Sequence, residues 1–290
     1  MVTRQAGEAA RQRLLRALPV EEHQLDVDGI TTSVLEGGQG SPMVLLHGGA
    51  PAGGVVWGVG PAMARLAQSH RLVVPDLPGL GESKPFVHLD PAAFDDWFAD
   101  LLRLTCQERP TLIAHSLPAS LAARYAAQHG DRIRRLVLMG TPALGRYRPP
   151  LAFMLAALRM GLRPSEANLA RFNRWAFHDL DRTRKDLGEP FEALNIYSLS
   201  RAVIPHVKRT MRQLVKAGTK QIPETDLRRI DAPTALVWGR QDRMGPLSFA
   251  ESASSRLSWP LYVIDDAGHI PPAEQPDAFL EALAAATGEE

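Results

Sequence analysis

Short runs of almost wholly apolar residues recur along the chain and alternate with segments of helical periodicity. The apolar runs cover residues 43–46, 71–75, 111–114, 133–139, 234–238 and 260–264. A strand that is apolar at nearly every position is typical of a sheet covered on both faces. The segments between them, 60–69, 91–108, 119–129, 246–257 and 274–285, have helical patterns. The alternation predicts an α/β fold with a mostly parallel central sheet and helices on both faces.

Two regions depart from this alternation. Residues 1–20 predict a short helical extension, and residues 22–27 and 30–35 predict a hairpin with an Asp28-Gly29 turn. From 144 to 221 the pattern is helical with no intervening strand, and prolines interrupt it. We therefore expect a core formed by 21–143 and 222–290, with 144–221 inserted as a helical cap over the carboxyl edge of the sheet.

A single serine occupies the junction between one predicted strand and the next helix. The pentapeptide Ala114-His115-Ser116-Leu117-Pro118 links the apolar run 111–114 to the Ala-rich segment 119–129. A serine in such a sharp turn presents its hydroxyl beside the first amides of a helix, as a nucleophile for acyl transfer requires. Taken alone, the pentapeptide fits a helix N-cap serine equally well.

A carboxylate and an imidazole follow two later strands. Asp242 lies just after the run 234–238, and His269 lies just after 260–264. Both positions are expected at the edge of the sheet that carries Ser116. Each residue alone fits a turn or a surface loop, and Asp265 and Asp266 are rival carboxylates close to His269.

Glycine-rich loops follow two early strands. The loop 47–54 brings backbone amides into reach of a ligand, and the Gly49 amide is a candidate oxyanion donor. His47 is a possible base, but its place directly after a strand favours a scaffold role. The loop 76–83 is not a dinucleotide fingerprint, because Lys84 occupies the third glycine position. No P-loop and no paired Cys/His metal spacing occurs, so we expect chemistry without a cofactor or metal.

Composition narrows the class of partner. The 290 residues have a formal net charge of +1 with no long run of one sign, which gives no reason to expect nucleic acid as a partner. The single cysteine, Cys106, favours a reducing compartment. The first residues lack a signal-peptide pattern, and no apolar stretch reaches the length of a membrane span. We expect a soluble cytoplasmic protein that acts on a small molecule without a membrane partner; its oligomeric state stays open.

Taken in chain order, Ser116, Asp242 and His269 resemble the catalytic triad of the α/β-hydrolase superfamily. The segments 47–49, 76–83, 114–116, 238–242 and 267–269 carry the same resemblance, which covers nearly all of the chain outside residues 1–20. It implies a Ser116 nucleophile, a His269 base oriented by Asp242, and an oxyanion hole formed by the Leu117 and Gly49 amides.

The elbow departs from the family pattern at both outer positions, which hold Ala114 and Pro118 in place of glycine. The alanine is a mild change. Proline is tolerated in the first helical turn and leaves the Leu117 amide free, but it disfavours helical angles at the preceding residue. We therefore expect a distorted elbow with low or unusual activity.

The resemblance implies a serine hydrolase that cleaves a small, mainly apolar carboxylic ester or related carbonyl compound. Apolar cap side chains motivate this substrate class, and the substrate-binding candidates are Trp57, Met154, Phe172 and Trp175. An alternative is a carbon–carbon bond hydrolase of diketone ring-fission products, although such enzymes usually have tryptophan after the catalytic histidine, where this chain has Ile270. A non-catalytic ligand-binding member of the fold is a third possibility.

Overall fold

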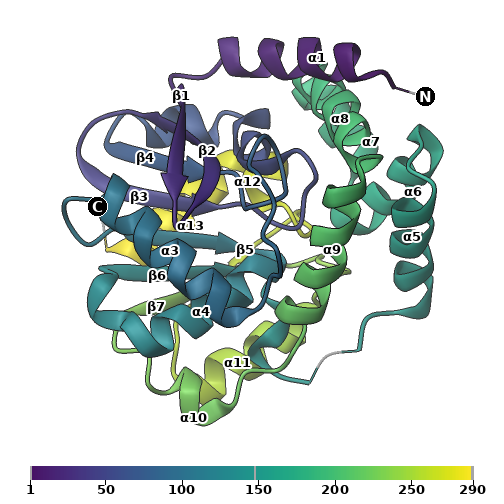
Figure 1. The fold of residues 1–290 in the computed structure, drawn as a ribbon. Helices are drawn as coiled ribbons and strands as arrows, with labels where there is room; N and C mark the ends of the chain where they lie inside the picture. Colours follow the sequence, from purple (N-terminus) through teal and green to yellow (C-terminus); the bar gives the residue numbers. More distant parts are fainter. Residues whose placement is uncertain (1, 147, 289–290) are drawn as a thin grey trace.

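The computed structural model describes residues 2–146 and 148–288, and within them eight strands form one sheet (Figure 1). The strand order is β1-β2-β4-β3-β5-β6-β7-β8; β1 and β2 pair antiparallel, β2 pairs antiparallel with β4, and the others pair parallel. The strands are β1 (Glu21–Val27), β2 (Ile30–Gly37), β3 (Ser41–Leu46), β4 (His70–Pro75), β5 (Thr111–His115), β6 (Arg135–Met139), β7 (Thr234–Gly239) and β8 (Leu261–Ile264). The predicted mostly parallel sheet is confirmed.

Helices cover both faces of the sheet and give each face its own apolar core. In β3, Val44 and Leu46 belong to one core and Met43 and Leu45 to the other, as the twofold period of a strand requires. The first core lies under α3 (Pro91–Thr105), α4 (Ser116–His129) and α11 (Leu247–Leu257). The second lies under α1 (Arg4–Arg16), η1 (Gly53–Val59), α2 (Ala62–Leu66) and α13 (Pro276–Thr287). These two apolar layers explain the runs of buried residues in the sequence.

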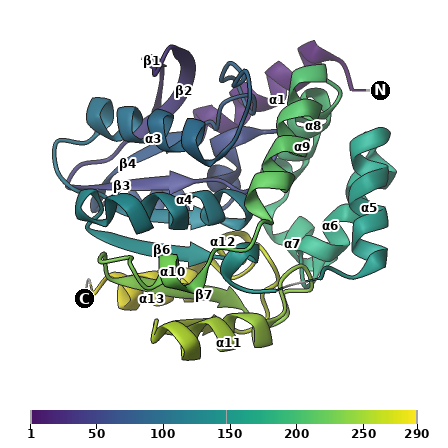
Figure 2. The ribbon, with the colours of Figure 1, turned by 60° about the horizontal axis from the view of Figure 1, so that its bottom comes forward.

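Five of the helices between β6 and β7 lie beyond the carboxyl edge of the sheet (Figures 1 and 2). They are α5 (Leu151–Leu162), α6 (Glu166–Ala176), α7 (Leu180–Leu187), α8 (Glu189–Ala202) and α9 (Pro205–Gly218), followed by the short α10 (Glu224–Leu227). Helix α9 packs on α4, and α8 packs on α1. Of the described helices, none is both long and apolar enough to cross a membrane.

Two local predictions differ from the structure. The sequence predicts one helix over 60–69, but a 3₁₀ turn, η1, ends before the extended Gly60, and only α2 is helical. Pro61 then forms the N-cap of α2, which explains the late start. Within 144–221, the apolar pattern predicts helices over 151–160, 165–177, 190–199 and 202–217 but none over α7, a highly charged helix whose first turn is capped by the Asp179 side chain.

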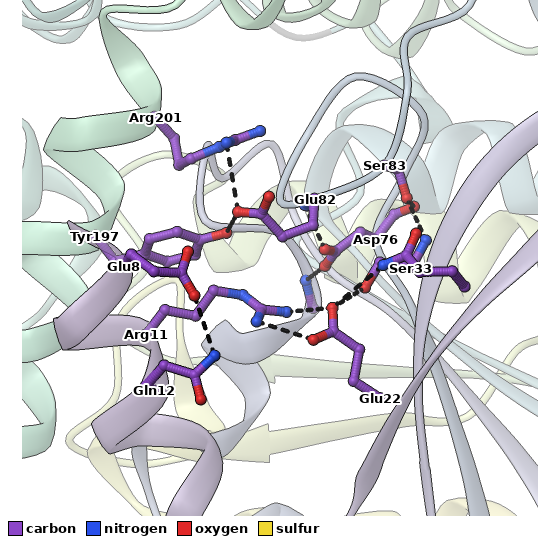
Figure 3. Close-up of polar contacts among 12 residues, drawn as sticks. Glu8, Arg11, Gln12, Glu22, Ser33, Asp76, Glu82, Ser83, Tyr197 and Arg201 are labelled. Carbon is purple, nitrogen blue, oxygen red and sulfur yellow. Dashed lines mark hydrogen bonds and ion pairs between the residues drawn. The ribbon is translucent and has the colours of Figure 1, made fainter. Parts of the chain in front are cut away.

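The N-terminal helix α1 lies directly against α8. A Cβ atom added at Gly7 would lie 2.0 Å from Ser200 Oγ, so only glycine permits this approach. The Arg11 side chain crosses to β1, where Nη2 lies 2.6 Å from Glu22 Oε1 (Figure 3). The same guanidinium lies 5.8 Å from the ring centre of Tyr197 in α8. Helix α1 therefore contacts both the sheet and α8.

A second set of polar contacts joins α8 to the loop after β4 (Figure 3). The Tyr197 hydroxyl donates a hydrogen bond of 2.7 Å to Glu82, and an Arg201 guanidinium nitrogen lies 3.3 Å from the same carboxylate. The Glu82 amide donates to Asp76, which directly follows β4. These contacts fix α8 to the core on the side away from α5 and α6.

Candidate active site

Ser116 occupies a strained backbone position between β5 and α4. Its φ angle is +61°, a left-handed conformation that costs a non-glycine residue about 1–2 kcal/mol. Gly48, in the loop after β3, makes room for the turn, because a Cβ there would lie 2.8 Å from the His115 ring and 3.4 Å from Ser116 Cβ. Helix α4 begins at Ser116 and continues through Pro118, so the proline does not delay the helix.

Ser116, His269 and Asp242 form a continuous hydrogen-bonded chain. The Ser116 hydroxyl lies 3.0 Å from His269 Nε2, and His269 Nδ1 lies 2.8 Å from Asp242 Oδ2. The second oxygen of Asp242 accepts hydrogen bonds from the Met244 and Gly245 amides at 2.7 and 2.9 Å. All three side chains are buried, with residue exposures of at most 9 %. A proton on Nδ1 directed at Asp242 leaves Nε2 free to accept the serine proton.

The rival carboxylates near His269 have other surroundings. Asp265 pairs with Arg240 at the surface. Asp266 has a φ angle of +54° and accepts a hydrogen bond from Arg182 through its carbonyl group. The structure therefore brings Asp242, rather than either neighbour, to the imidazole.

Gly49 and Leu117, the residues predicted to supply the oxyanion donors, are neighbours in the structure. The Leu117 amide is in the first turn of α4, where the helix supplies no acceptor, and Gly49 is in the loop after β3. A Cβ added at Gly49 would lie 3.3 Å from a Leu117 methyl group and 3.3 Å from the Met211 methyl group. Helix α9 also brings Leu214 within 3.7 Å of that point, so the Cα of Gly49 faces apolar side chains.

Comparison with known proteins identifies the family. The family model of the alpha/beta hydrolase fold matches residues 41–276. The chain belongs to the α/β-hydrolase family. It is 27% identical to the 2-hydroxymuconate semialdehyde hydrolase of Pseudomonas putida, over 87% of this chain and 88% of that protein. It is also 27% identical to the pimeloyl-[acyl-carrier protein] methyl ester esterase of Aeromonas hydrophila, over 88% of this chain and 98% of that protein. A carboxylesterase structure from Bacillus subtilis superposes with a TM-score of 0.77 at 20% identity, covering 97% of this chain and 98% of that one.

Two residues that the sequence did not identify restrict the imidazole of this α/β hydrolase. Gly140 follows β6 with a φ angle of +56°, and a Cβ there would lie 2.4 Å from His269 Cε1. On the other side, the His115 ring centre lies 4.7 Å from that of His269, and its Nε2 donates to the His269 carbonyl group at 2.8 Å. Burial, with the nearby His269 ring, lowers the pKa of His115 to about 3, so His115 is neutral.

Glu274 holds the loop that carries His269. Its two oxygens accept hydrogen bonds from the Gly268 amide at 2.8 Å and the His178 amide at 2.6 Å. Burial raises the pKa of Glu274 to about 7, although these hydrogen bonds oppose the rise. The His269 amide also donates to Ala176 at 2.7 Å, so the C-terminal end of α6 is bonded directly to the histidine loop.

His47 joins two loops of the hydrolase core instead of contacting the triad. Its Nδ1 donates to the Gly48 carbonyl group at 2.6 Å, and its Nε2 accepts from the Leu77 amide at 3.0 Å. Burial lowers the pKa of His47 to about 4, which keeps the ring neutral. This contact pattern fits the scaffold role and positions the loop that carries Gly49.

Of the four predicted substrate-binding residues, Trp57 lies apart from the other three, which are on α5 and α6. Trp57 is buried in the second core, with its ring 6.4 Å from that of Phe279. Phe172 and Trp175 of α6 pack against Phe153 of α5, and Met154 is exposed on α5. These contacts do not support a common binding site beside Ser116. Among the described residues, no group of three or more His, Cys, Asp or Glu side chains is arranged to hold a metal ion.

Proposed function

We propose that this protein is a serine hydrolase that cleaves a small, mainly apolar carboxylic ester through an acyl-enzyme. The observation that carries the proposal is the buried chain from the Ser116 hydroxyl through His269 to Asp242, with both hydrogen bonds at or below 3.0 Å. A serine hydroxyl needs such a base, because its own pKa is too high for attack at neutral pH. The left-handed backbone at Ser116 supports the same role.

The reaction proceeds in two balanced steps. Ser116 Oγ attacks the ester carbonyl while His269 Nε2 takes its proton, and the Gly49 and Leu117 amides donate to the oxyanion. The tetrahedral intermediate collapses, the carbon–oxygen bond breaks, and the leaving alcohol takes the proton from His269. Water then attacks the acyl group while His269 takes its proton. The bond between the acyl carbon and Ser116 Oγ breaks, His269 returns the proton to Ser116, and the carboxylic acid is released.

The apolar preference rests on the helices that we propose as a cap, residues 144–221. Met211 and Leu214 of α9 lie beside the Gly49 position, where the acyl group would sit during attack. Such side chains favour an alkyl group over a charged one because a charge buried there would lose hydration without gaining a partner. The esterase relative supports an ester as substrate, and its whole length is nearly covered by this chain.

A second candidate is hydrolysis of a carbon–carbon bond in a ring-fission diketone. It is favoured by the similarity to the 2-hydroxymuconate semialdehyde hydrolase. The Ile270 side chain after His269, in place of the tryptophan usual in such enzymes, favours the ester. Initial rates with p-nitrophenyl acetate and butyrate, compared with a 2-hydroxy-6-oxo-dienoate, separate the two reactions.

Fluorophosphonate labelling tests the nucleophile itself. The wild type should gain one probe mass, and Ser116→Ala should gain none. Ser120→Ala is a matched control, because Ser120 is a fully buried serine of the same helix whose hydroxyl has no hydrogen-bond partner in the described structure. Labelling of Ser116→Ala, or a wild type that neither labels nor turns over esters, contradicts the proposal and favours a non-catalytic binding protein.

A further inference from the structure

Helix α5 has apolar side chains on two opposite sides. On its inner side, the Phe153 ring packs 6.0 Å from Phe172 and 5.9 Å from Trp175 of α6, measured between ring centres. Its outer side presents five large apolar side chains that are 41–71 % exposed: Leu151, Met154, Leu155, Leu158 and Leu162. This spacing places the five on one helical stripe.

Such a helix normally lies inside a protein or in lipid, because apolar residues on every side leave no face suited to water. Yet α5 lies at the outer edge of the molecule in both views, and α6 is its main neighbour (Figures 1 and 2). The five exposed side chains amount to roughly 500 Å² of apolar surface, the size of a functional patch on a monomer. We call them the α5 stripe.

Positive charge flanks the α5 stripe at both ends. Arg146 and Arg148 precede the helix, and Arg159 and Arg163 lie at its C-terminal end; all four are exposed. Residues 141–165 contain no Asp or Glu, and the first acid is Glu166. In the part of the chain that the structure describes, none of these four guanidinium groups forms a hydrogen bond or ion pair.

We propose that the α5 stripe docks on an anionic lipid surface. The apolar side chains enter the boundary between headgroups and acyl chains, and the flanking arginines contact lipid phosphates. Helix α5 has 12 residues and is about 18 Å long, so it lies in the surface and does not span the roughly 30 Å hydrocarbon core. The sequence predicts no membrane partner because no apolar stretch is long enough to span, and sequence alone does not show that this side of α5 faces outward.

A second copy of the chain fits the α5 stripe less well. Pairing two α5 helices would bring together two sets of arginines without an acid between them. The stripe is also smaller than the about 800 Å² that each partner buries in a standard stable interface. An anionic lipid surface offers acyl chains for the apolar side chains of the α5 stripe and phosphates for the four arginines.

Vesicle flotation tests the proposal with the whole protein. We expect co-flotation with vesicles of phosphatidylcholine and phosphatidylglycerol, little with phosphatidylcholine alone, and release by high salt. Ser116→Ala protein is used in parallel so that turnover cannot alter the lipid. The triple variant Leu151→Gln, Leu158→Gln and Leu162→Gln should bind at least tenfold more weakly while keeping its melting temperature, because these side chains are exposed.

The charge of the surface is tested separately. Arg159→Gln with Arg163→Gln should weaken binding to anionic vesicles by about fivefold for each arginine removed. Leu104→Gln, on α3 and with an exposure similar to Leu155, should bind like the wild type. No binding of the wild type to anionic vesicles, or equal binding by the triple variant, overturns the proposal. So does a wild-type dimer in sedimentation that the triple variant abolishes without any vesicle binding.

Discussion

Gly140→Ala gives a direct measure of how tightly the His269 ring is held. The new Cβ would lie 2.4 Å from His269 Cε1, whereas ordinary contacts begin at 3.4 Å. The ring must therefore withdraw by about 1 Å, a displacement that costs on the order of 100-fold in rate. The loss should appear in kcat for p-nitrophenyl butyrate and in the rate of fluorophosphonate labelling, with a smaller change in KM.

The alanine also carries a backbone cost that has to be separated from the collision. Gly29 in the hairpin turn has a φ angle of +72°, and a Cβ added there would have no atom within 4 Å. Gly29→Ala therefore carries the cost of a left-handed alanine backbone, about 1–2 kcal/mol, without any steric collision. Both variants are assayed well below their melting temperatures. A kcat/KM for Gly140→Ala within threefold of that for Gly29→Ala would refute the reasoning.

Three further substitutions test the surroundings of the site. Asp242→Asn should lower kcat by about 10⁴-fold because the imidazole loses its oriented tautomer, whereas Asp265→Asn should keep near wild-type rates in the same ester assay. Glu274→Gln can accept only one of the two backbone hydrogen bonds and should lose about 1–3 kcal/mol in urea denaturation. Burial raises the folded-state pKa of Glu274 to about 7, above its unfolded value. The stability that its proton provides is therefore present below the unfolded pKa and is lost as pH rises through about 7. Between pH 5 and pH 8 the free energy of unfolding of the wild type should fall more than that of Glu274→Gln. Arg11→Ala should lose about 1–3 kcal/mol, because the partly exposed Glu22 then loses the guanidinium but keeps the Ser33 hydrogen bond. Burial acts to raise the pKa of Glu22, but hydrogen bonds from Arg11 and Ser33 outweigh it and lower the pKa. This stabilisation should therefore fade in acid for the wild type, and fade less for Arg11→Ala, which keeps the Ser33 hydrogen bond without the guanidinium.

The parallel part of the sheet was predictable because β3 to β7 are almost wholly buried and so are apolar at nearly every position. Ser116, Asp242 and His269 each follow a predicted strand. Because these strands are parallel, their carboxyl ends share one edge of the sheet, and the three residues were expected to meet there. The expected distortion at Pro118 is not seen, since the first helical turn needs no amide there.

Other contacts between distant segments were not predictable from the sequence. Nothing local marks Gly140 as the residue beside His269, since glycines follow several strands. Trp57 is a binding candidate by residue type alone, yet its ring is taken up by packing against Phe279. Whether the leucines of α5 face inward or outward also depends on α6, because the helix is apolar on both sides.

The short connection between α6 and α7 ties the histidine loop to the inserted helices. Ala176 accepts from the His269 amide, His178 donates to Glu274, and Phe177 accepts from Arg243 close to Asp242. Grafting the helical insertion of another hydrolase onto this chain would remove these anchors together with the helices. A chimaera should therefore keep residues 176–178 from this chain, even where its new substrate requires every neighbouring helix to be exchanged.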